Sequence, residues 1–486
     1  MLFAGSGNER SWQDGWKMRQ EFPQNGPGPI IATASSETAA GAAKAARAAL
    51  AMGASRAEIR LDILASEGER HKAVELASEI PLLVSGDRIM VRPDEWPHFK
   101  RASELGAWID LPAEGAPEKL LEQIAPSRLI LSWHGRPGER KALSEVTERM
   151  RQKRAAAYKV VPFADDENGN LQARDLLSSR GSLNDLIVFA SGSSGVLSRI
   201  LAIAWGSLAT YASAPGCAPA GEGQPSLDLL LSCAPLEIKS STPLIALLGW
   251  PLQFSKTPSF FNRWLREADR PERYVLFPLK ELKDFARLAR DFNLLGAAVT
   301  IPHKQAAMKE AAFHSRLAMA TGAANTLLKR PEGWMAANTD VYGVRSAVKR
   351  PAAPRPRTLL LGSGGAAAAA AMALCRRGPV AVCARDSAKA GFLASRFNCE
   401  TVPWEERENA KWDLLVNATP LGLREGESPM FGERLKCGAI LDMVIPREGE
   451  TTLVKAARHQ GVRVFHGETM LEAQARLQFR LFAPSP

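Results

Sequence analysis

Two residues in the first half of the sequence suggest carbonyl chemistry. Lys159 lies in the apolar segment "AAAYKVVP", and His134 ends the apolar segment "LILSWH". A lysine held inside a protein has a lowered pKa, and its free amine can form a Schiff base with a ketone. A nearby imidazole can move the protons that such a reaction requires. Simpler interpretations stay open, because a lysine can also reach solvent from a sheet edge and a single histidine is often a core or surface residue.

Further polar residues accompany the predicted strands of this half. Glu58, Arg60 and Asp62 alternate along one strand, so their side chains point the same way. Three more stand at or after the ends of other predicted strands: Arg92, Arg199 and Gln224. We therefore expect acidic, basic and imidazole groups to converge at one end of the fold.

The second half carries a different set of reactive groups. Lys304 in "VTIPHK" and Asp340 in "NTD" could pair as an ammonium and a carboxylate for proton transfer, although an ordinary surface ion pair is the alternative. Ser255 and Thr257 precede a helix that Pro258 could begin. Hydroxyls and backbone amides at a helix N-terminus can bind a carboxylate, and a simple helix cap is the other interpretation.

A glycine-rich segment, "TLLLGSGGAAAAAAMAL" (358–374), is either a phosphate-binding turn between a strand and a helix or an alanine-rich helix preceded by glycines. Its context favours the turn, because it follows a proline-rich break and precedes another apolar strand. The residues predicted to hold the cofactor there are Gly362, Ser363, Gly364, Gly365 and Ala366.

The next predicted strand, "VAVCA", ends in Arg385, with Ser387 and Lys389 nearby. NAD-binding domains usually place an acidic residue at this point for the ribose 2′-hydroxyl. Basic side chains attract a 2′-phosphate instead. The sequence therefore predicts NADP as the cofactor, although Asp386 directly follows Arg385.

These groups must be positioned by a regular series of elements. Eight strand-like segments alternate with helical patterns over just under 200 residues, which predicts an α/β fold with an N-terminal (β/α)₈ barrel. An open doubly wound sheet is the alternative. The predicted strands are 30–35, 58–63, 88–92, 107–111, 128–134, 156–162, 186–191 and 207–212.

Composition narrows the class of protein. The 486 residues are 45% hydrophobic and 23% charged, which is typical of a soluble globular chain with two or three domains. The net charge of +10 is spread along the chain, so we expect small anionic ligands and no nucleic acid. No apolar run is long enough for a membrane span, the first 27 residues do not resemble a signal peptide, and six scattered cysteines without CxxC favour neither disulfides nor zinc. We expect a cytoplasmic enzyme without a bound metal.

The motifs of the first half resemble type I 3-dehydroquinate dehydratase over residues 28–232. They are "EIRLD", "VRP", "LSWH", "YKVV", "GSSGVLSR" and "GQPS", in that order. The resemblance implies that Lys159 forms the Schiff base and that His134 is the acid and base. It also implies that the substrate's hydroxyls and carboxylate are bound by Glu58, Arg60, Arg92, Arg199 and Gln224. Arg199 is our choice for the carboxylate, since a guanidinium matches its geometry.

The second half resembles shikimate dehydrogenase over residues 244–483, through "SKTP", "VTIPHK", "GAANT", "NTD" and "GETMLEAQARLQF". The resemblance implies that Lys304 and Asp340 are catalytic, that Ser255 and Thr257 bind the carboxylate, and that Met443 and Gly467 lie near the nicotinamide. The ring hydroxyls would be bound by Thr300, Asn325, Asp340 and Gln474.

Taken together, the resemblances imply a bifunctional enzyme that dehydrates 3-dehydroquinate and then reduces 3-dehydroshikimate to shikimate with NADPH. The predicted parts are a lead-in (1–27), the barrel (28–233), a linker (234–243), a shikimate-binding domain (244–348), a Rossmann-like NADP domain (357–465) and a C-terminal helix returning to the substrate domain (466–486). The sequence predicts no oligomeric state.

Departures from both families keep alternatives open. The segment "RPDEWP" and the eighth loop, "APAGEGQ", differ from the dehydratase pattern, so the barrel could be a scaffold beside an active dehydrogenase. Phe254, Ala298 and Ile445 replace common polar residues of the dehydrogenase, which leaves quinate open as the preferred substrate. A regulatory NADP-binding module without turnover is a further alternative, although Lys304 and Asp340 are intact.

Overall fold

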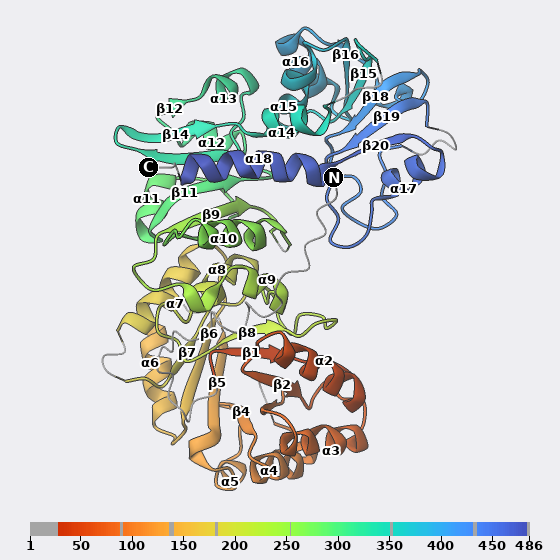
Figure 1. Ribbon diagram of the computed structural model, residues 1–486. Helices are drawn as coiled ribbons and strands as arrows, with labels where there is room; N and C mark the ends of the chain where they lie inside the picture. Colours follow the sequence, from red (N-terminus) through yellow and green to blue (C-terminus); the bar gives the residue numbers. More distant parts are fainter. Residues whose placement is uncertain are drawn as a thin grey trace. The chain divides into compact units, whose positions relative to one another are not determined.

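The computed structural model describes residues 28–87, 91–135, 140–179, 183–252, 254–349, 353–430 and 435–483, with only the backbone for 140–142. The chain divides into two compact units (Figure 1). The first runs to Leu231 and includes Pro235–Ser240; the second holds Ser232–Ala234 and the chain from Ser241. Within the described ranges, no helix has the length and apolar character needed to cross a bilayer.

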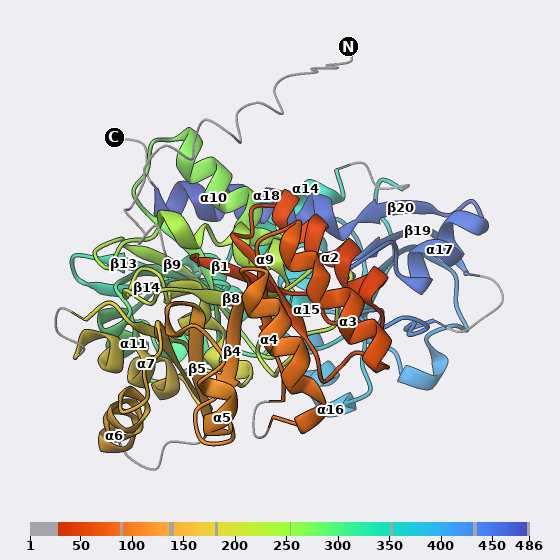
Figure 2. The same ribbon diagram turned by 90° about the horizontal axis from the view of Figure 1, so that it is seen from below.

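The first unit is a parallel eight-stranded barrel ringed by helices (Figures 1 and 2). Its strands are β1 (Ile30–Thr33), β2 (Arg56–Arg60), β3 (Leu82–Ser85), β4 (Trp108–Pro112), β5 (Leu129–Gly135), β6 (Ala157–Pro162), β7 (Leu186–Val188) and β8 (Thr210–Ser213). Its helices are α2 (Ala39–Ala51), α3 (Glu67–Glu75), α4 (Trp96–Glu104), α5 (Glu118–Leu121), α6 (Arg140–Arg151), α7 (Asn168–Ser178), α8 (Val196–Leu201) and α9 (Leu227–Ser232). The predicted barrel is confirmed.

The barrel is nearly closed. The strand order runs β7-β6-β5-β4-β3-β2-β1-β8, so β7 and β8 are its two edges. The gap is bridged next to these strands, where Leu208 N–H donates to the Leu186 carbonyl over 2.9 Å and Val188 N–H donates to Ser207 Oγ over 3.0 Å. Such bonds satisfy edge groups that would otherwise be left unpaired.

The third strand lies elsewhere than the sequence predicts. We expected it at 88–92, but Leu82–Ser85 pairs with β2 and β4 at this place in the barrel. Leu82, Leu83 and Val84 are almost completely buried, so this segment supplies the core contacts. Residues 88–90 lie outside the described ranges, and Arg92 instead caps a short 3-10 helix, Pro93–Glu95, that begins with a proline.

The front part of the second unit is a mixed sheet. Its order is β10-β9-β11-β13-β14-β12, with β9, β10 and β11 parallel and β13 antiparallel to β11. The strands are β9 (Leu244–Gly249), β10 (Arg273–Pro278), β11 (Leu294–Val299), β12 (Phe313–His314), β13 (Thr326–Arg330) and β14 (Gly333–Ala337). The helices are α10 (Thr257–Glu267), α11 (Phe285–Asp291), α12 (Ala306–Lys309), α13 (Arg316–Thr321) and α14 (Asp340–Ala347).

The back part is a parallel sheet of order β17-β16-β15-β18-β19-β20, which is the doubly wound order of dinucleotide-binding folds. Its strands are β15 (Thr358–Leu361), β16 (Val380–Cys383), β17 (Glu400–Thr401), β18 (Trp412–Asn417), β19 (Cys437–Asp442) and β20 (Arg463–His466). One face packs on α14, α15 (Gly365–Leu374) and α16 (Ser387–Phe397), and the other packs on α17 (Thr452–His459). The last helix, α18 (Gly467–Phe482), leaves this sheet and packs against α14, β11 and β13 (Figure 1).

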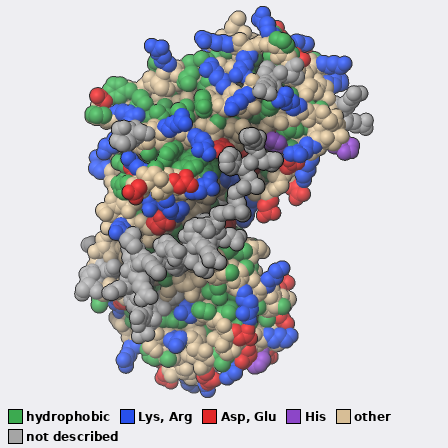
Figure 3. Space-filling model, viewed as in Figure 1, with side chains coloured by type: hydrophobic (Ala, Val, Ile, Leu, Met, Phe, Trp, Pro, Cys, Tyr) green, Lys and Arg blue, Asp and Glu red, His purple; other side chains and the backbone are tan. Residues whose placement is uncertain are grey.

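Charge is distributed over the surface. On the face seen in Figure 3, lysine and arginine side chains are scattered over both units, with acidic side chains among them.

Candidate active sites

The alternation of the barrel strands directs a set of polar side chains inward. All seven are at most 6% exposed, and all line one cavity of about 560 Å³, counted with its space open to solvent. They are Thr33, Glu58, Ser85, Asp110, Ser132, Lys159 and Tyr211. A polar layer inside a barrel is costly to bury unless its members satisfy one another, which marks this layer as a candidate site.

Lys159 forms the central contact of this layer. Its Nζ donates a hydrogen bond to Asp110 Oδ2, and the two side chains are 7% and 2% exposed. The same Nζ lies 4.7 Å from the centroid of the Tyr211 ring. Burial raises the pKa of Asp110, an effect that the Lys159 ammonium opposes. Asp110 was not predicted from the sequence, although an aspartate inside the apolar strand "AWIDL" was a usable signal.

Glu58 and Gln224 belong to one hydrogen-bond network. Thr33 Oγ1 donates to Glu58 Oε2 over 2.5 Å, and Ser85 Oγ donates to Glu58 Oε1 over 2.8 Å. Gln224 Nε2 donates to Thr33 Oγ1 over 2.9 Å, while its Oε1 accepts from Ala220 N over 2.7 Å. The network therefore joins the loop after β8 to the strands at the cavity wall.

Three further predicted residues line the same cavity: Arg60, His134 and Arg199. Arg60 donates to both oxygens of Asp62, over 3.0 and 2.5 Å. Burial lowers the pKa of Arg60, but the hydrogen bonds to Asp62 together with the negative charges of Asp62, Glu58 and Asp87 outweigh it, and the net shift is upward. The guanidinium of Arg199 lies 4.3 Å from the ring centroid of Phe189.

Arg92 stands apart from this group. Its side chain is 42% exposed and pairs with the buried Glu95, with 2.7 Å between Nη2 and Oε1. The third strand instead brings Ser85, Gly86 and Asp87 to the cavity wall. The shift of β3 explains the difference, because the expected position of Arg92 depended on a strand at 88–92.

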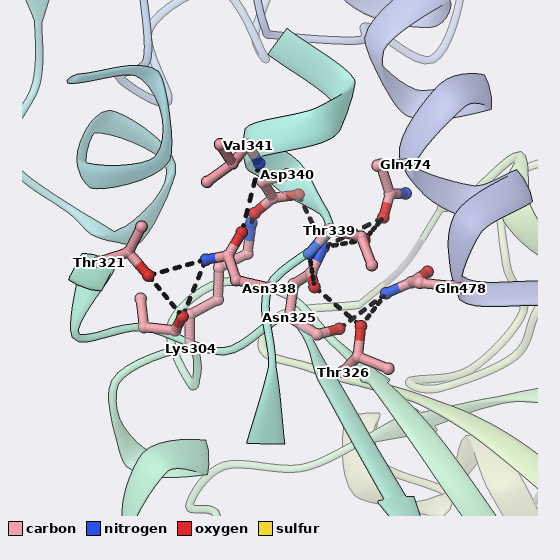
Figure 4. A network of polar contacts seen from close by, with 11 residues as sticks. Lys304, Thr321, Asn325, Thr326, Asn338, Thr339, Asp340, Val341, Gln474 and Gln478 are labelled. Carbon is pink, nitrogen blue, oxygen red and sulfur yellow. Dashed lines mark hydrogen bonds and ion pairs between the residues drawn. The ribbon is translucent and has the colours of Figure 1, made fainter. Parts of the chain in front are cut away.

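The second unit holds its own lysine–carboxylate pair (Figure 4). Lys304 Nζ donates to Asp340 Oδ2 over 2.5 Å, with side chains 15% and 6% exposed. Asn325 Nδ2 donates to the other oxygen, Asp340 Oδ1, over 2.8 Å. The pair joins the turn after β11 to the first residue of α14, so two parts of the fold fix its geometry.

A network of neutral polar groups surrounds this pair (Figure 4). Asn325 Nδ2 also lies within hydrogen-bond distance of Thr339 Oγ1 and Gln474 Oε1, at 2.8 and 3.1 Å. Gln478 Nε2 donates to the Asn325 carbonyl over 2.8 Å and to Thr326 Oγ1 over 3.0 Å. Thr339 and Gln478 were not predicted from the sequence, although Gln478 stands one helical turn after Gln474.

The cleft beside the pair gathers the remaining predicted ligand-binding residues of this unit. Its volume is about 1210 Å³, counted with space open to solvent. The predicted residues that line it are Ser255, Thr257, Thr300, Lys304, Asn325, Asp340, Ala366, Met443, Gly467 and Gln474. Thr257 N–H donates to Ser255 Oγ over 3.1 Å, so Ser255 supports the start of α10. Phe254, Ala298 and Ile445 add apolar surface to the same cleft.

The glycine-rich turn lies between β15 and α15. Gly362 has φ +115°, and a Cβ there would lie 2.9 Å from the Ala418 carbonyl oxygen, so the tight turn requires glycine. Gly364 precedes α15, and a Cβ there would meet open space, which suits a phosphate approaching the helix N-terminus. At Gly365 a Cβ would lie 3.1 Å from the Cβ atoms of Ala323 and Lys304, so glycine lets α15 begin close to these two residues. The turn thus adjoins the lysine–carboxylate pair.

The basic residues after β16 lie at the surface, and the Lys389 ammonium forms an ion pair with Asp386, with 3.0 Å between Nζ and Oδ2. Arg385, Ser387 and Lys389 are all exposed at the start of α16. Asp386 is engaged locally, because its carboxylate accepts from Lys389 N–H over 3.0 Å and caps the helix. This cap lowers the pKa of Asp386. The residues present fit a cofactor with a 2′-phosphate.

The fold and the two cavities define the class: a (β/α)₈ barrel with a buried lysine in its cavity, joined to a two-part fold of the oxidoreductase type. Among the described residues no group of three or more His, Cys, Asp or Glu side chains could hold a metal ion.

Comparison with known proteins identifies both units. Residues 30–234 match the family model "Type I 3-dehydroquinase", and residues 247–327 match "Shikimate dehydrogenase substrate binding domain". A shikimate dehydrogenase (NADP(+)) of Oleidesulfovibrio alaskensis is 35% identical over 249 residues, which are 49% of this chain and 89% of that protein. The protein of the same name from Pelobacter propionicus is 35% identical, over 49% of this chain and 90% of its own length.

A solved shikimate 5-dehydrogenase of Thermus thermophilus matches 50% of this chain and 94% of its own, at 31% identity and a TM-score of 0.45. The chain belongs to the shikimate dehydrogenase family, and a type I 3-dehydroquinase domain precedes that part. Both predicted family resemblances are confirmed.

Proposed function

We propose that the chain catalyses two consecutive reactions, the dehydration of 3-dehydroquinate to 3-dehydroshikimate and the NADPH-dependent reduction of 3-dehydroshikimate to shikimate. The observation that supports this most strongly is that each unit holds a lysine–carboxylate pair in a cavity, at the lysine that its family resemblance marks as catalytic. The two lysines belong to two unrelated folds, so each reaction has its own site.

In the barrel, the Lys159 amine attacks the substrate ketone and forms an imine, and water leaves. His134 then removes the proton beside the imine carbon and returns a proton to the leaving hydroxyl. Hydrolysis of the imine releases the product and the free amine. Glu58, Arg60, Arg199 and Gln224 would hold the substrate from the wall of the cavity. Arg92 does not line the cavity formed by the described residues, so its part in substrate binding stays a prediction.

In the second unit, Lys304 and Asp340 stand at the reacting carbonyl and supply or remove its proton. Asn325 holds Asp340 in place. The ring hydroxyls would be bound by four residues that line the cleft: Thr300, Asn325, Asp340 and Gln474. Ser255 and Thr257 bind the carboxylate. NADPH, when bound, supplies the hydride.

The choice of NADP rests on the basic residues after β16 and on the relatives, whose names carry NADP(+). The residues that would hold it at the turn are Gly362, Ser363, Gly364 and Ala366, with Met443 and Gly467 near the nicotinamide. Arg385, Ser387 and Lys389 would bind the 2′-phosphate. The ligands we propose are therefore the small-molecule acids and this nucleotide.

We also infer a cytoplasmic location. All six cysteines are free thiols, and burial raises the pKa of Cys233 to about 12 and that of Cys383 to about 11. Free thiols of this kind persist in a reducing compartment.

One reaction mixture tests the whole proposal. The full chain with 3-dehydroquinate and NADPH should form shikimate, seen as loss of nicotinamide absorbance and by mass. Lys159→Ala should leave 3-dehydroquinate unchanged and still reduce added 3-dehydroshikimate. Formation of 3-dehydroshikimate by Lys159→Ala would contradict the role of the barrel, and preference for quinate with NADP would correct the second substrate.

A further inference from the structure

The contact between Lys159 and Asp110 has a consequence for how the amine reacts. The hydrogen bond joins the middle of β6 to the middle of β4, and both side chains are almost completely buried. Asp110 Oδ1, the second oxygen, is buried and has no hydrogen-bond partner among the described residues. Lys159 therefore supplies the charged contact of Asp110, and the hydroxyl of Ser132 lies beside the same carboxyl in the cavity wall.

Glu58 and Tyr211 line the same cavity but are arranged differently toward Lys159. The carboxylate of Glu58 is engaged on both oxygens by the hydroxyls of Thr33 and Ser85. Tyr211 meets the ammonium with its ring, not with its hydroxyl. Asp110 is the carboxylate that touches the reacting nitrogen.

We propose that Asp110 accepts the proton that Lys159 must lose before it attacks a ketone, and that the resulting carboxylate later pairs with the iminium nitrogen. This inference rests on the proposed dehydratase function. Asp110 would then be a catalytic residue in addition to Lys159 and His134, since it would contact the lysine nitrogen both as the ammonium and as the iminium.

The proton and charge balance supports one carboxylate in both roles. The ammonium carries three protons; one passes to Asp110, and the neutral amine attacks the carbonyl carbon with its lone pair. The protonated iminium keeps one proton, so the two that the nitrogen gives up, one of them through Asp110, leave with the ketone oxygen as water. At the start the site holds an ammonium and a carboxylate, and at the end an iminium and a carboxylate.

Burial makes this conservation of charge important. A buried cation without a partner is strongly disfavoured, whether it is an ammonium or an iminium. A buried carboxyl whose pKa is raised is also a better proton acceptor than an exposed one. The ionisable groups that share the cavity wall with this pair are Glu58, Arg60, Asp87, His134, Arg199 and Tyr211.

The test is trapping of the iminium by borohydride in the full chain, with 3-dehydroquinate as the probe and the Lys159 peptide measured by mass. Asp110→Asn should slow formation of the reduced adduct by about 100-fold or more, the lower range for a lost proton-transfer group. Asp185→Asn is the matched control: it removes the same charge from an ion pair with Arg151 just before β7, and should trap within about twofold of the wild type.

A second variant separates this role from a folding defect. Asp110→Ala should be slow in buffer, and added formate should restore trapping in proportion to its concentration, because a small carboxylate can enter the vacated place. A misfolded barrel gives no such rescue. Wild-type rates in Asp110→Asn, or no rescue of Asp110→Ala by formate, would overturn the inference. A wild-type chain that forms no adduct would instead overturn the proposed dehydratase function.

Discussion

The two lysine–carboxylate pairs use the same residue types in different surroundings. In the barrel, Asp110 is bound by Lys159 through one oxygen, and its other oxygen has no hydrogen-bond partner among the described residues. In the second unit, Asp340 is bound through both oxygens, by Lys304 and by the amide of Asn325. The charged contact of Asp110 comes from Lys159, whereas Asp340 is held by Lys304 and by the hydrogen-bond network of Asn325.

This difference bears on the chemistry that each lysine can perform. An almost fully buried amine that contacts one carboxylate and one aromatic ring among the described residues is suited to give up a proton and become a nucleophile. A lysine at a cleft, facing a carboxylate whose other oxygen accepts from the neutral amide of Asn325, is suited to exchange a proton with a bound ligand without covalent chemistry. Four predictions test this contrast, in order of expected effect.

Removing the second lysine gives the largest effect. Lys304→Ala should lower the kcat for reduction of 3-dehydroshikimate by about 10²- to 10⁴-fold, because the proton at the carbonyl loses its donor. Dehydration of 3-dehydroquinate by the same variant should be unchanged. Lys283→Ala is the control, since this exposed lysine pairs with the similarly exposed Glu281. Equal loss of both activities would contradict independent sites.

The second-largest effect is expected on NADP affinity, through Arg385. Arg385→Ala should weaken NADP binding by about 10- to 100-fold, since a hydrogen bond to a charged group is worth roughly 1.5–3 kcal/mol. Binding of NAD should not change. Titration of intrinsic fluorescence with each nucleotide measures both, with the exposed Arg376→Ala as control. Parallel weakening of NAD and NADP would show that Arg385 does not read the 2′-phosphate.

A third buried carboxylate, Asp442, shows how burial affects stability when the hydrogen-bond partners are neutral. Among the described residues, Asp442 accepts hydrogen bonds from three neutral donors: Asn417 Nδ2, Thr451 Oγ1 and Val444 N–H, at 2.9, 2.6 and 3.1 Å. Burial raises the pKa of Asp442, and these hydrogen bonds oppose the shift. Below the unfolded-state pKa, about 4, the carboxyl is protonated in both states and costs nothing.

As pH rises through the raised folded pKa, ionisation therefore removes stability. Asp442→Asn has no such proton, so it should become more stable relative to the wild type between about pH 4 and neutrality, and then level off. Thermal unfolding at several pH values measures this difference. If the stability difference between Asp442→Asn and the wild type stays constant as pH rises, or changes in favour of the wild type, the hydrogen bonds outweigh burial.

The smallest effect belongs to an exposed pair. Lys256 Nζ lies 2.6 Å from Glu468 Oε1, with side chains 42% and 61% exposed. Glu468→Gln should change the free energy of unfolding by less than about 1 kcal/mol, because solvent screens such pairs. Breaking a buried pair costs about 3–5 kcal/mol by comparison. Urea unfolding of the full chain decides it, and a loss above about 2 kcal/mol would contradict the distinction.

Sequence motifs predicted the architecture well, because alternating strands and helices and the glycine turn are local patterns. The predicted position of the third strand was wrong. Two apolar segments, 82–85 and 88–92, both have strand-like sequences, and pairing with β2 and β4 identifies 82–85 as the strand. Lys159 and Lys304 stood out by their neighbours in the sequence.

The partners that complete the candidate sites were harder to predict. Asp110 is 49 residues from Lys159, and its contact exists only because parallel strands bring both to one layer of the barrel. Thr339 and Gln478 contact Asn325, and these contacts depend on the packing of β13, α14 and α18, although the spacing of Gln478 from Gln474 was a local signal. Arg92 is the opposite case. It stands in the motif that the resemblance predicts, but it does not line the cavity formed by the described residues.

The most direct measurement of the central contrast compares the two lysines in one sample. The full chain is treated with 3-dehydroquinate and borohydride, digested, and analysed by peptide mass. The account predicts a reduced adduct on the peptide that contains Lys159 and an unmodified peptide that contains Lys304. An adduct on Lys304, or none on Lys159, would contradict it.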